Sequence, residues 1–224
     1  MSLATDLDAL TQGLIENKTI PQDALDVIFG QIQDLVKSGQ ADRALMAGQM
    51  APTFRLRDTN GKMFDSSQAL TKGPLVVTFF RGVWCAYCNL ELRALEAART
   101  QIEARGATVV ALSMQDAEHS GESKSANQLG FPVLLDPGGD IADRFGLRSQ
   151  IPDDLAKVYL AGGTDLEKIN GEASWTVPIP ALYVIGEDGI VAYAEINPDF
   201  TKRAEPTDVF PVLDKLRSNT SWRI

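Results

Sequence analysis

Apolar residues recur at helical spacing in the first part of the chain. Leu3, Leu7, Leu10 and Leu14 are separated by three or four positions, which puts them on one face of a helix. A second stripe follows Pro21, a residue suited to the first turn of a helix, and consists of Ala24, Leu25, Ile28, Ile32, Leu35 and Val36. Two short helices cannot bury both stripes alone. We therefore expect them to pack on the rest of the chain or on a second copy.

After Ala51 the pattern changes to short apolar runs separated by amphipathic stretches. The predicted strands are 54–57 paired with 63–64 around a type I′ turn at 59–62, then 75–80, 108–112, 131–135, and a hairpin of 181–185 with 190–194. The predicted helices are 89–105, about 116–129, 141–145 and 206–216, and 149–175 is interpreted as an insertion with a helix near 153–160. Strands alternating with helices predict an α/β fold with a right-handed parallel core.

Composition narrows the classes of function. The chain has 224 residues, 44% of them hydrophobic, which is ample for a core. A net charge of −9 argues against binding nucleic acid or an anionic membrane surface. No apolar run approaches the roughly 18 residues of a membrane-spanning helix, and residues 1–8 do not resemble a signal peptide. With only two cysteines, we predict a cytoplasmic protein.

The two cysteines form the motif with the most chemical content, Trp84-Cys85-Ala86-Tyr87-Cys88. The motif lies between a predicted buried strand and a predicted helix. A helix N-terminus offers unpaired N–H groups and partial positive charge, and both stabilise a thiolate. Cysteines three positions apart in a first turn are also close enough to form a disulfide. The pattern favours a redox-active dithiol.

Two other interpretations compete with a redox dithiol. A zinc site needs about four ligands, and the chain offers one histidine, His119, beside the two cysteines. Buried cysteines are also often inert core residues. The Cys-x-x-Cys spacing near a βαβ pattern outweighs both. We expect no metal and no cofactor.

Several segments are similar to one known family. Residues 79–95, which contain the cysteine motif, resemble the peroxiredoxin-like branch of the alkyl hydroperoxide reductase / thiol-specific antioxidant (AhpC/TSA) family. Further similarity lies at Ala51-Pro52-Thr53-Phe54, and in the segments 131–137, 174–181 and 201–206. The resemblance divides the chain into a helical extension (1–48), a thioredoxin-like domain (49–218) and a tail (219–224).

The resemblance implies a thioredoxin-like fold, in which a central mixed sheet is flanked by helices. It also implies a thiol-dependent peroxidase, which reduces peroxides through the dithiol and is recycled by a thioredoxin- or glutathione-type reductant. Two alternatives stay open at this point. One is a thioredoxin-like oxidoreductase acting on protein disulfides, and the other is a non-catalytic redox sensor.

The chain departs from the usual peroxiredoxin pattern, Pro-x-x-x-Thr-x-x-Cys. In that alignment Cys88 takes the place of the peroxidatic cysteine, Cys85 that of the threonine and Arg81 that of the proline. Trp84-Cys85-x-x-Cys88 resembles instead the thioredoxin arrangement, in which the first cysteine is the exposed nucleophile. We therefore predict Cys85 as the nucleophile and Cys88, one turn inside the helix, as its resolving partner.

Three residues are predicted to form the substrate pocket around this dithiol. Arg81 adds positive charge beside the thiolate, and Trp84 shields one side of it. Pro180 resembles the cis-proline that faces the thioredoxin dithiol. Tyr87, between the cysteines, is expected to be exposed.

The remaining expectations concern capping and assembly. Asp65 and Asp116 are candidates for helix caps, and His119 is expected at the surface. The unpaired helical stripes favour a homodimer.

Overall fold

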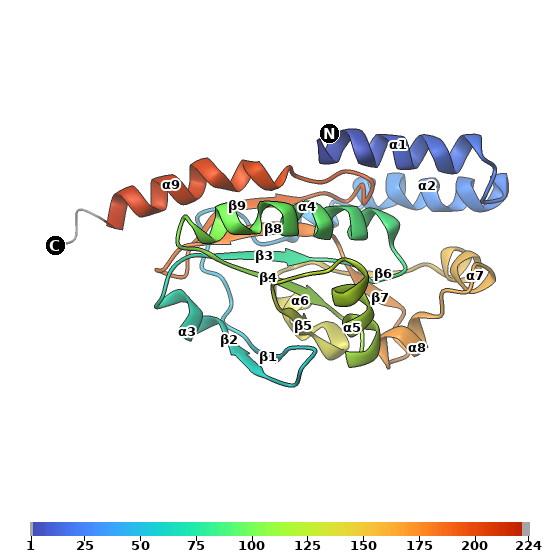
Figure 1. Ribbon diagram of the computed structural model, residues 1–224. Helices are drawn as coiled ribbons and strands as arrows, with labels where there is room; N and C mark the ends of the chain where they lie inside the picture. Colours follow the sequence, from blue (N-terminus) through green and yellow to red (C-terminus); the bar gives the residue numbers. More distant parts are fainter. Residues whose placement is uncertain (1, 221–224) are drawn as a thin grey trace.

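The fold is built on a five-stranded mixed sheet, shown in the computed structural model, which describes residues 2–220 (Figure 1). The strand order is β5-β4-β3-β8-β9. Strands β3, β4 and β5 are parallel, β8 is antiparallel to β3, and β9 is antiparallel to β8. Their bounds are β3 (Leu75–Phe79), β4 (Thr108–Ser113), β5 (Val133–Leu135), β8 (Ala181–Ile185) and β9 (Val191–Ile196). The predicted parallel core with an antiparallel terminal hairpin is confirmed.

Helices and two small sheets surround this sheet. The small sheets pair β1 (Arg55–Arg57) with β2 (Met63–Asp65) and β6 (Arg148–Gln150) with β7 (Thr176–Pro178). The helices are α1 (Leu3–Glu16), α2 (Gln22–Lys37), α3 (Ser66–Leu70), α4 (Ala86–Glu103), α5 (Ala117–Ala126), α6 (Asp140–Arg144), α7 (Asp153–Ala161), α8 (Leu166–Asn170) and α9 (Val209–Thr220), with 3₁₀ turns η1 (Gln40–Arg43), η2 (Pro137–Gly139) and η3 (Pro206–Asp208).

A hydrophobic core lies on each face of the central sheet. Alternate residues of a strand point to opposite faces. Val76 and Val109 therefore join the core under α4 and α9, whereas Val77 and Val110 join the core under α3 and α6. Both faces of the central strands are apolar, as expected for parallel strands covered on both sides.

The first hairpin forms with a different turn from the predicted one. A type I′ turn needs positive φ at both central residues, but among the described residues of this loop only Gly61 has it, at 78°. The Asp58 carboxylate accepts hydrogen bonds from the backbone N–H groups of Asn60 and Lys62, each at 2.9 Å. This side-chain bonding stabilises a wider loop, so the type I′ prediction is wrong.

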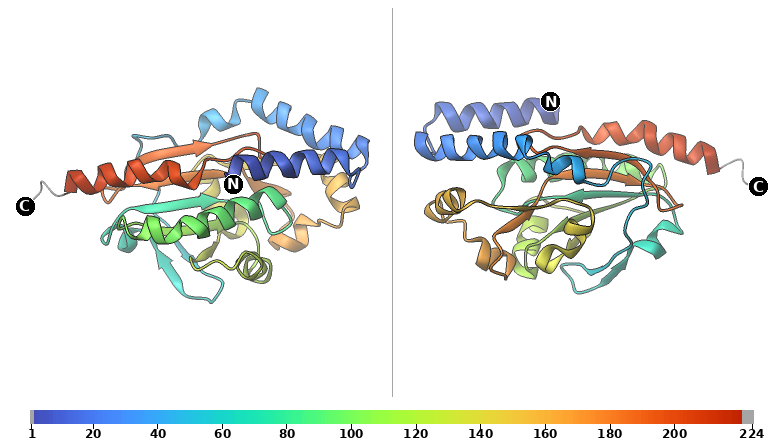
Figure 2. Two further views of the ribbon diagram at one scale, coloured as in Figure 1. Left: turned by 45° about the horizontal axis from the view of Figure 1, so that its top comes forward. Right: turned by 180° about the vertical axis from the view of Figure 1, so that it is seen from behind.

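The N-terminal helices form a hairpin near the carboxyl end of β3, with α1 against α4 and α2 against α7 (Figures 1 and 2). Leu3 and Leu7 of α1 and Leu25 of α2 are buried. The two stripes therefore pack mainly on their own chain, which is one of the two expected solutions. Within the described range, no helix is both long and apolar enough to cross a bilayer.

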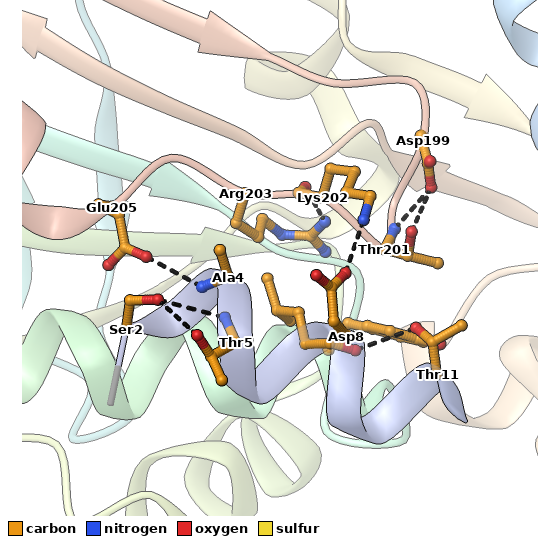
Figure 3. A network of polar contacts seen from close by, with 12 residues as sticks. Ser2, Ala4, Thr5, Asp8, Thr11, Asp199, Thr201, Lys202, Arg203 and Glu205 are labelled. Atoms are coloured by element: carbon orange, nitrogen blue, oxygen red, sulfur yellow. Dashed lines mark hydrogen bonds and ion pairs between the residues drawn. The ribbon is translucent and has the colours of Figure 1, made fainter. Parts of the chain in front are cut away.

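Polar contacts tie α1 to the segment that precedes α9 (Figure 3). The Glu205 carboxylate accepts hydrogen bonds from the backbone N–H groups of Leu3 (3.2 Å) and Ala4 (2.9 Å) at the start of the helix. Lys202 Nζ pairs with Asp8 at 2.7 Å. A carboxylate at a helix N-terminus also interacts favourably with the helix dipole, so these contacts fix the position of α1.

The insertion predicted at 149–175 is ordered. It contains α7 and α8 and forms its own core around Leu155 and Leu166. The predicted tail begins inside α9, whose backbone continues to Thr220, and residues 221–224 lie outside the described residues.

We expect Leu7→Ala to lower the free energy of unfolding by about 2–5 kcal/mol, because Leu7 is buried between α1 and α4 and the truncation leaves a cavity. Ile15→Ala on the same helix is the control, since Ile15 is 49% exposed and its loss should change the value by less than about 0.5 kcal/mol. Chemical denaturation measures both. Equal effects would show that α1 is not packed as described.

Candidate active site

The two cysteines lie where β3 passes into α4. Cys85 is the N-cap of α4, with extended backbone angles of −91° and 104°, and Cys88 lies in its first turn. The connecting loop is held by side chains: Gln115 Oε1 accepts from Val83 N at 2.8 Å, and Asn89 Nδ2 donates to Val83 O at 2.7 Å. The strand-to-helix junction predicted from sequence is therefore present, with the dithiol at its helix end.

Both sulfur-bearing side chains are buried, and both are free thiols. Cys85 is 4% exposed and Cys88 is fully buried. Cys85 is the more accessible of the two, as predicted, but the expectation that it is exposed is wrong. The helical hairpin of α1 and α2 and the inserted helix α7 lie over this end of the sheet and exclude solvent.

The pKa values of the two thiols are shifted in opposite directions. Burial raises the pKa of Cys85, but a hydrogen bond from Cys88 and the positive charges of Arg81 and Arg203 outweigh it and lower this pKa to about 6. Burial, together with the proximity of Cys85, raises the pKa of Cys88 well above its ordinary value. At neutral pH the pair therefore consists of a Cys85 thiolate and a Cys88 thiol.

Arg81 is buried beside this pair. Its guanidinium lies over the rings of Phe200 and Trp84, at 4.2 Å and 4.7 Å from their centroids, and donates a hydrogen bond to the Tyr159 hydroxyl. Aromatic faces attract cations most strongly where water is excluded. These rings allow the guanidinium to stay charged inside the protein.

Trp84 contributes to the same arrangement. Its ring is half-buried and packs on Tyr159 at 5.0 Å between centroids, and it lines the cavity in front of Cys85. The indole ring of Trp84 packs directly against the backbone of residue 82. Glycine is required there, because a Cβ would lie 2.4 Å from Trp84 Nε1.

Pro180 does not have the predicted cis geometry. Every peptide bond of the described residues is trans. Pro180 lies in the extended segment that joins β7 to β8, where the backbone N–H of Ile179 bonds to Leu147 O at 2.7 Å. It shares a small pocket with Arg81 and Phe200, but it does not line the cavity that contains Cys85.

The structure adds an ion pair that sequence reasoning missed. Glu91 Oε2 and Arg203 Nε are 2.7 Å apart, and each side chain is 3% exposed. Arg203 Nη2 also lies 3.5 Å from Cys88 Sγ. Burial raises the pKa of Glu91 to about 7, although Arg203 opposes the shift. Glu91 follows Cys88 by one helical turn, and this spacing could have indicated from the sequence that it lies near the dithiol. Nothing in local spacing connects Arg203 with the dithiol.

Tyr87 was expected to be exposed, and that expectation is wrong. The side chain is buried, its hydroxyl lies 3.0 Å from Thr11 Oγ1 on α1, and its ring packs edge-on against Phe200. The reason is that α1 covers the first turn of α4.

The remaining polar candidates have structural roles. Asp65 caps α3 and Asp116 caps α5, as predicted, by accepting hydrogen bonds from Gln68 N (3.2 Å) and His119 N (2.9 Å). The His119 ring bonds to Asp116 and does not approach the cysteines. Across the described part of the chain, no three His, Cys, Asp or Glu side chains gather as a metal site would require.

A cavity of about 800 Å³ opens in front of Cys85. Its lining includes Cys85, Arg81 and Trp84 together with residues of α2, α7 and neighbouring loops. Cys85 therefore lines a partly open space of small-molecule size.

Comparison with known proteins identifies the family. The profile of the AhpC/TSA family matches residues 47–194. The chain belongs to the AhpC/TSA family. With the dithiol at the start of α4, membership of this family makes the protein a thiol oxidoreductase and an enzyme.

Relatives come from two branches of thiol chemistry. The thiol-disulfide oxidoreductase ResA of Bacillus thuringiensis subsp. konkukian is 27% identical over 126 residues, covering 56% of this chain and 70% of that protein. The chloroplastic peroxiredoxin Q of Oryza sativa subsp. japonica is 27% identical over 150 residues, covering 67% of this chain and 58% of that protein.

Solved structures show the same fold. The peroxidoxin BcpB of Mycobacterium tuberculosis aligns with a TM-score of 0.60 at 18% identity, over 78% of this chain and 97% of that one. The reduced 2-Cys peroxiredoxin of Plasmodium vivax aligns with a TM-score of 0.58 at 16% identity, over 79% and 99%. These alignments support the predicted thioredoxin-like fold.

We expect the rate of Cys85 alkylation by a small reagent to rise with pH about a midpoint near 6, since only the thiolate reacts. Arg81→Gln should move this midpoint upward, because it removes one of the charges that stabilise the thiolate. Arg144→Gln, an exposed arginine on α6, is the control and should leave it in place. An unchanged midpoint in Arg81→Gln would contradict the electrostatic account.

Arg203→Met should destabilise the fold by about 3–5 kcal/mol at pH 9, because the Glu91 carboxylate is left buried without its partner. The pKa of Glu91 is already raised in the folded state, so its contribution to stability is present at low pH and lost as pH rises through about 7. The penalty should therefore shrink toward pH 5, where Glu91 binds a proton. Denaturation at both pH values measures this, and Arg99→Met on the exposed face of α4 should show a much smaller, pH-independent loss.

Proposed function

We propose that this protein reduces hydroperoxides, with Cys85 as the nucleophile and Cys88 as the resolving thiol. The observation that carries the proposal is the position of Cys85. Its pKa is lowered to about 6, and it lines a cavity of small-molecule size while being only 4% exposed.

The first step is oxidation of the thiolate. Cys85 S⁻ attacks the terminal oxygen of the hydroperoxide, so that an S–O bond forms and the O–O bond breaks. The product is a sulfenic acid on Cys85, and the alkoxide or hydroxide that leaves takes up a proton. The buried guanidinium of Arg81 lies beside this sulfur and stabilises the negative charge that develops on the leaving oxygen.

The second step forms the disulfide. Cys88 sulfur attacks the sulfenic sulfur of Cys85, an S–S bond forms, and the S–O bond breaks to release water. Cys88 must lose a proton in this step. Glu91, one turn further along α4 and with a pKa near 7, is the proton acceptor that fits, and Arg203 contacts both groups.

The third step regenerates the enzyme. An external reductant, either one thioredoxin-type dithiol or two glutathione-type thiols, supplies two electrons, the Cys85–Cys88 bond breaks, and the reductant becomes a disulfide. A reducing compartment, such as the cytoplasm, is part of this proposal.

The likeness to ResA favours a second candidate function, the reduction of protein disulfides. For that reaction a substrate sulfur must reach Cys85 in line with its own disulfide bond. Cys85 lies under α2 and α7, so the helices would have to move before a protein substrate could enter. A small peroxide needs no such movement in the oxidation step, which is why we favour the peroxidase function. A protein reductant would need the same movement to reach the Cys85–Cys88 disulfide, whereas a small thiol would not.

The homodimer expected from the sequence remains a prediction, but the structure changes which surface would form the dimer contact. The α1 and α2 stripes pack mostly on their own chain, although Val36 at the end of the α2 stripe is 52% exposed. A further surface for a second copy is the exposed apolar group of Met46, Met50 and Ile190. Sedimentation equilibrium at high micromolar concentration tests this, and a monomer would contradict it.

Steady-state peroxide consumption with a thioredoxin or glutathione system should show many turnovers, and insulin reduction should be slow by comparison. Cys85→Ser should abolish both peroxide consumption and the rapid alkylation at pH 6. Cys88→Ser should keep the alkylation, because a serine hydroxyl still donates a hydrogen bond, but should stop after one turnover. If Cys88→Ser instead removes the low-pH alkylation and Cys85→Ser keeps it, Cys88 is the nucleophile. A single oxidation of the wild type without turnover would indicate a sensor.

A further inference from the structure

The oxidation of Cys85 by a peroxide requires a proton donor for the leaving oxygen. When the O–O bond breaks, that oxygen departs as hydroxide or alkoxide, a strong base, since the pKa of water is about 15.7. Arg81 stabilises the charge on this oxygen but keeps its own proton, because a guanidinium stays protonated in proteins. The proton must therefore come from another group close to Arg81.

Two groups near the dithiol have their protons committed elsewhere. Cys88 is fully buried, does not line the cavity, and donates its hydrogen bond to Cys85. Tyr87 lines the cavity, but the Thr11 hydroxyl donates to Leu7 O at 3.0 Å. The Tyr87 hydroxyl must then be the donor in its own 3.0 Å bond with Thr11. Neither proton is directed toward a peroxide in the cavity.

Tyr159, on helix α7 of the insertion, carries a hydroxyl that is placed for this role. It lines the same cavity as Cys85, and its ring packs on Trp84 at 5.0 Å between centroids. Its oxygen accepts a hydrogen bond from Arg81 Nη2, so the phenolic proton is left for a different acceptor. Within residues 2–220, no protein group accepts that proton. The guanidinium that stabilises the leaving oxygen is therefore bonded to a hydroxyl with a proton to give.

We propose that the Tyr159 hydroxyl is the acid that protonates the leaving oxygen of the peroxide. The inference rests on the peroxidase function proposed above. As the bond from Cys85 sulfur to the terminal oxygen forms, the electron pair of the O–O bond moves to the leaving oxygen, which takes the phenolic proton and departs as water or an alcohol. The phenolate that remains is paired with Arg81 and regains a proton from water in the partly open cavity.

The charge of the Cys85 thiolate keeps Tyr159 protonated until the reaction begins. Burial raises the pKa of Tyr159, and the negative charge of Cys85 raises it further, although Arg81 opposes both. Attack on the peroxide moves that charge from the sulfur to the leaving oxygen. The opposition to losing the phenolic proton therefore ends at the moment when an acceptor for it appears.

A leaving group that needs no proton separates this role from a structural one. Hydrogen peroxide releases hydroxide, whereas peracetic acid releases acetate, which is stable as an anion because carboxyl groups have pKa values of about 4. At pH 7, Tyr159→Phe should slow the oxidation of Cys85 by hydrogen peroxide about 100- to 10,000-fold, and should change its oxidation by peracetic acid less than about threefold. Loss of the alkylatable Cys85 thiol in a single turnover of the reduced protein measures both rates.

Tyr193→Phe is the matched control, because it removes a hydroxyl from strand β9, outside the cavity, and it should keep both wild-type rates. The midpoint of Cys85 alkylation should stay near 6 in Tyr159→Phe, which shows that the site is folded and that Arg81 still acts on the sulfur. A measurement on the wild type does not depend on the variant: oxidation by hydrogen peroxide should be slower in deuterium oxide, because a proton moves as the O–O bond breaks.

The outcomes separate this inference from the peroxidase function on which it rests. Equal slowing of both oxidants in Tyr159→Phe would make Tyr159 a structural residue and overturn its role as the acid. So would an unchanged rate with hydrogen peroxide in Tyr159→Phe, or the absence of an isotope effect in the wild type, and in each case the peroxidase function would stand. Oxidation of the wild type by hydrogen peroxide no faster than that of free cysteine would overturn both.

Discussion

The site depends on keeping a negatively charged sulfur inside the protein. Removing a charge from water is costly unless opposite charge and hydrogen bonds compensate it. Here the compensation comes from the Cys88 thiol and from two buried arginines, Arg81 and Arg203. Each arginine needs its own support: aromatic rings surround Arg81, and Glu91 pairs with Arg203. The charged sulfur is therefore supported by residues from the loop between β3 and α4, from α4 and α7, and from the segment before α9.

The appended elements cover the cysteine end of a common fold. The extension packs α1 on α4 and α2 on α7, and the contacts of Glu205 and Lys202 with α1 join it to the segment that carries Phe200 and Arg203. The same helices that bury Cys85 leave a cavity in front of it. The burial of Cys85 and the cavity beside it are thus two results of one packing arrangement.

Local sequence patterns correctly predicted the structural features that depend only on neighbouring residues. The strands, the helical stripes, the helix caps at Asp65 and Asp116, and the position of Cys85 at the start of α4 all follow from periodicity and end signals within a few residues. The type I′ turn prediction was wrong for a local reason, the hydrogen bonds to Asp58. Two other errors occurred where a distant segment decided the outcome. Tyr87 is buried because α1 covers it, and Pro180 is trans in an extended segment held by Leu147.

The sequence by itself determined the family, the alternation that builds the sheet and the placement of two thiols at a helix N-terminus. Only the tertiary structure decided how far the thiols are buried and which charges face them. Arg203 is separated from Cys88 by 115 positions, yet its guanidinium lies 3.5 Å from that sulfur. Backbone propensities act over one or two turns, whereas electrostatic shifts and cavities arise from side chains that long-range packing brings together. No local pattern records that packing, so the chemistry of the dithiol became visible only once the chain was folded.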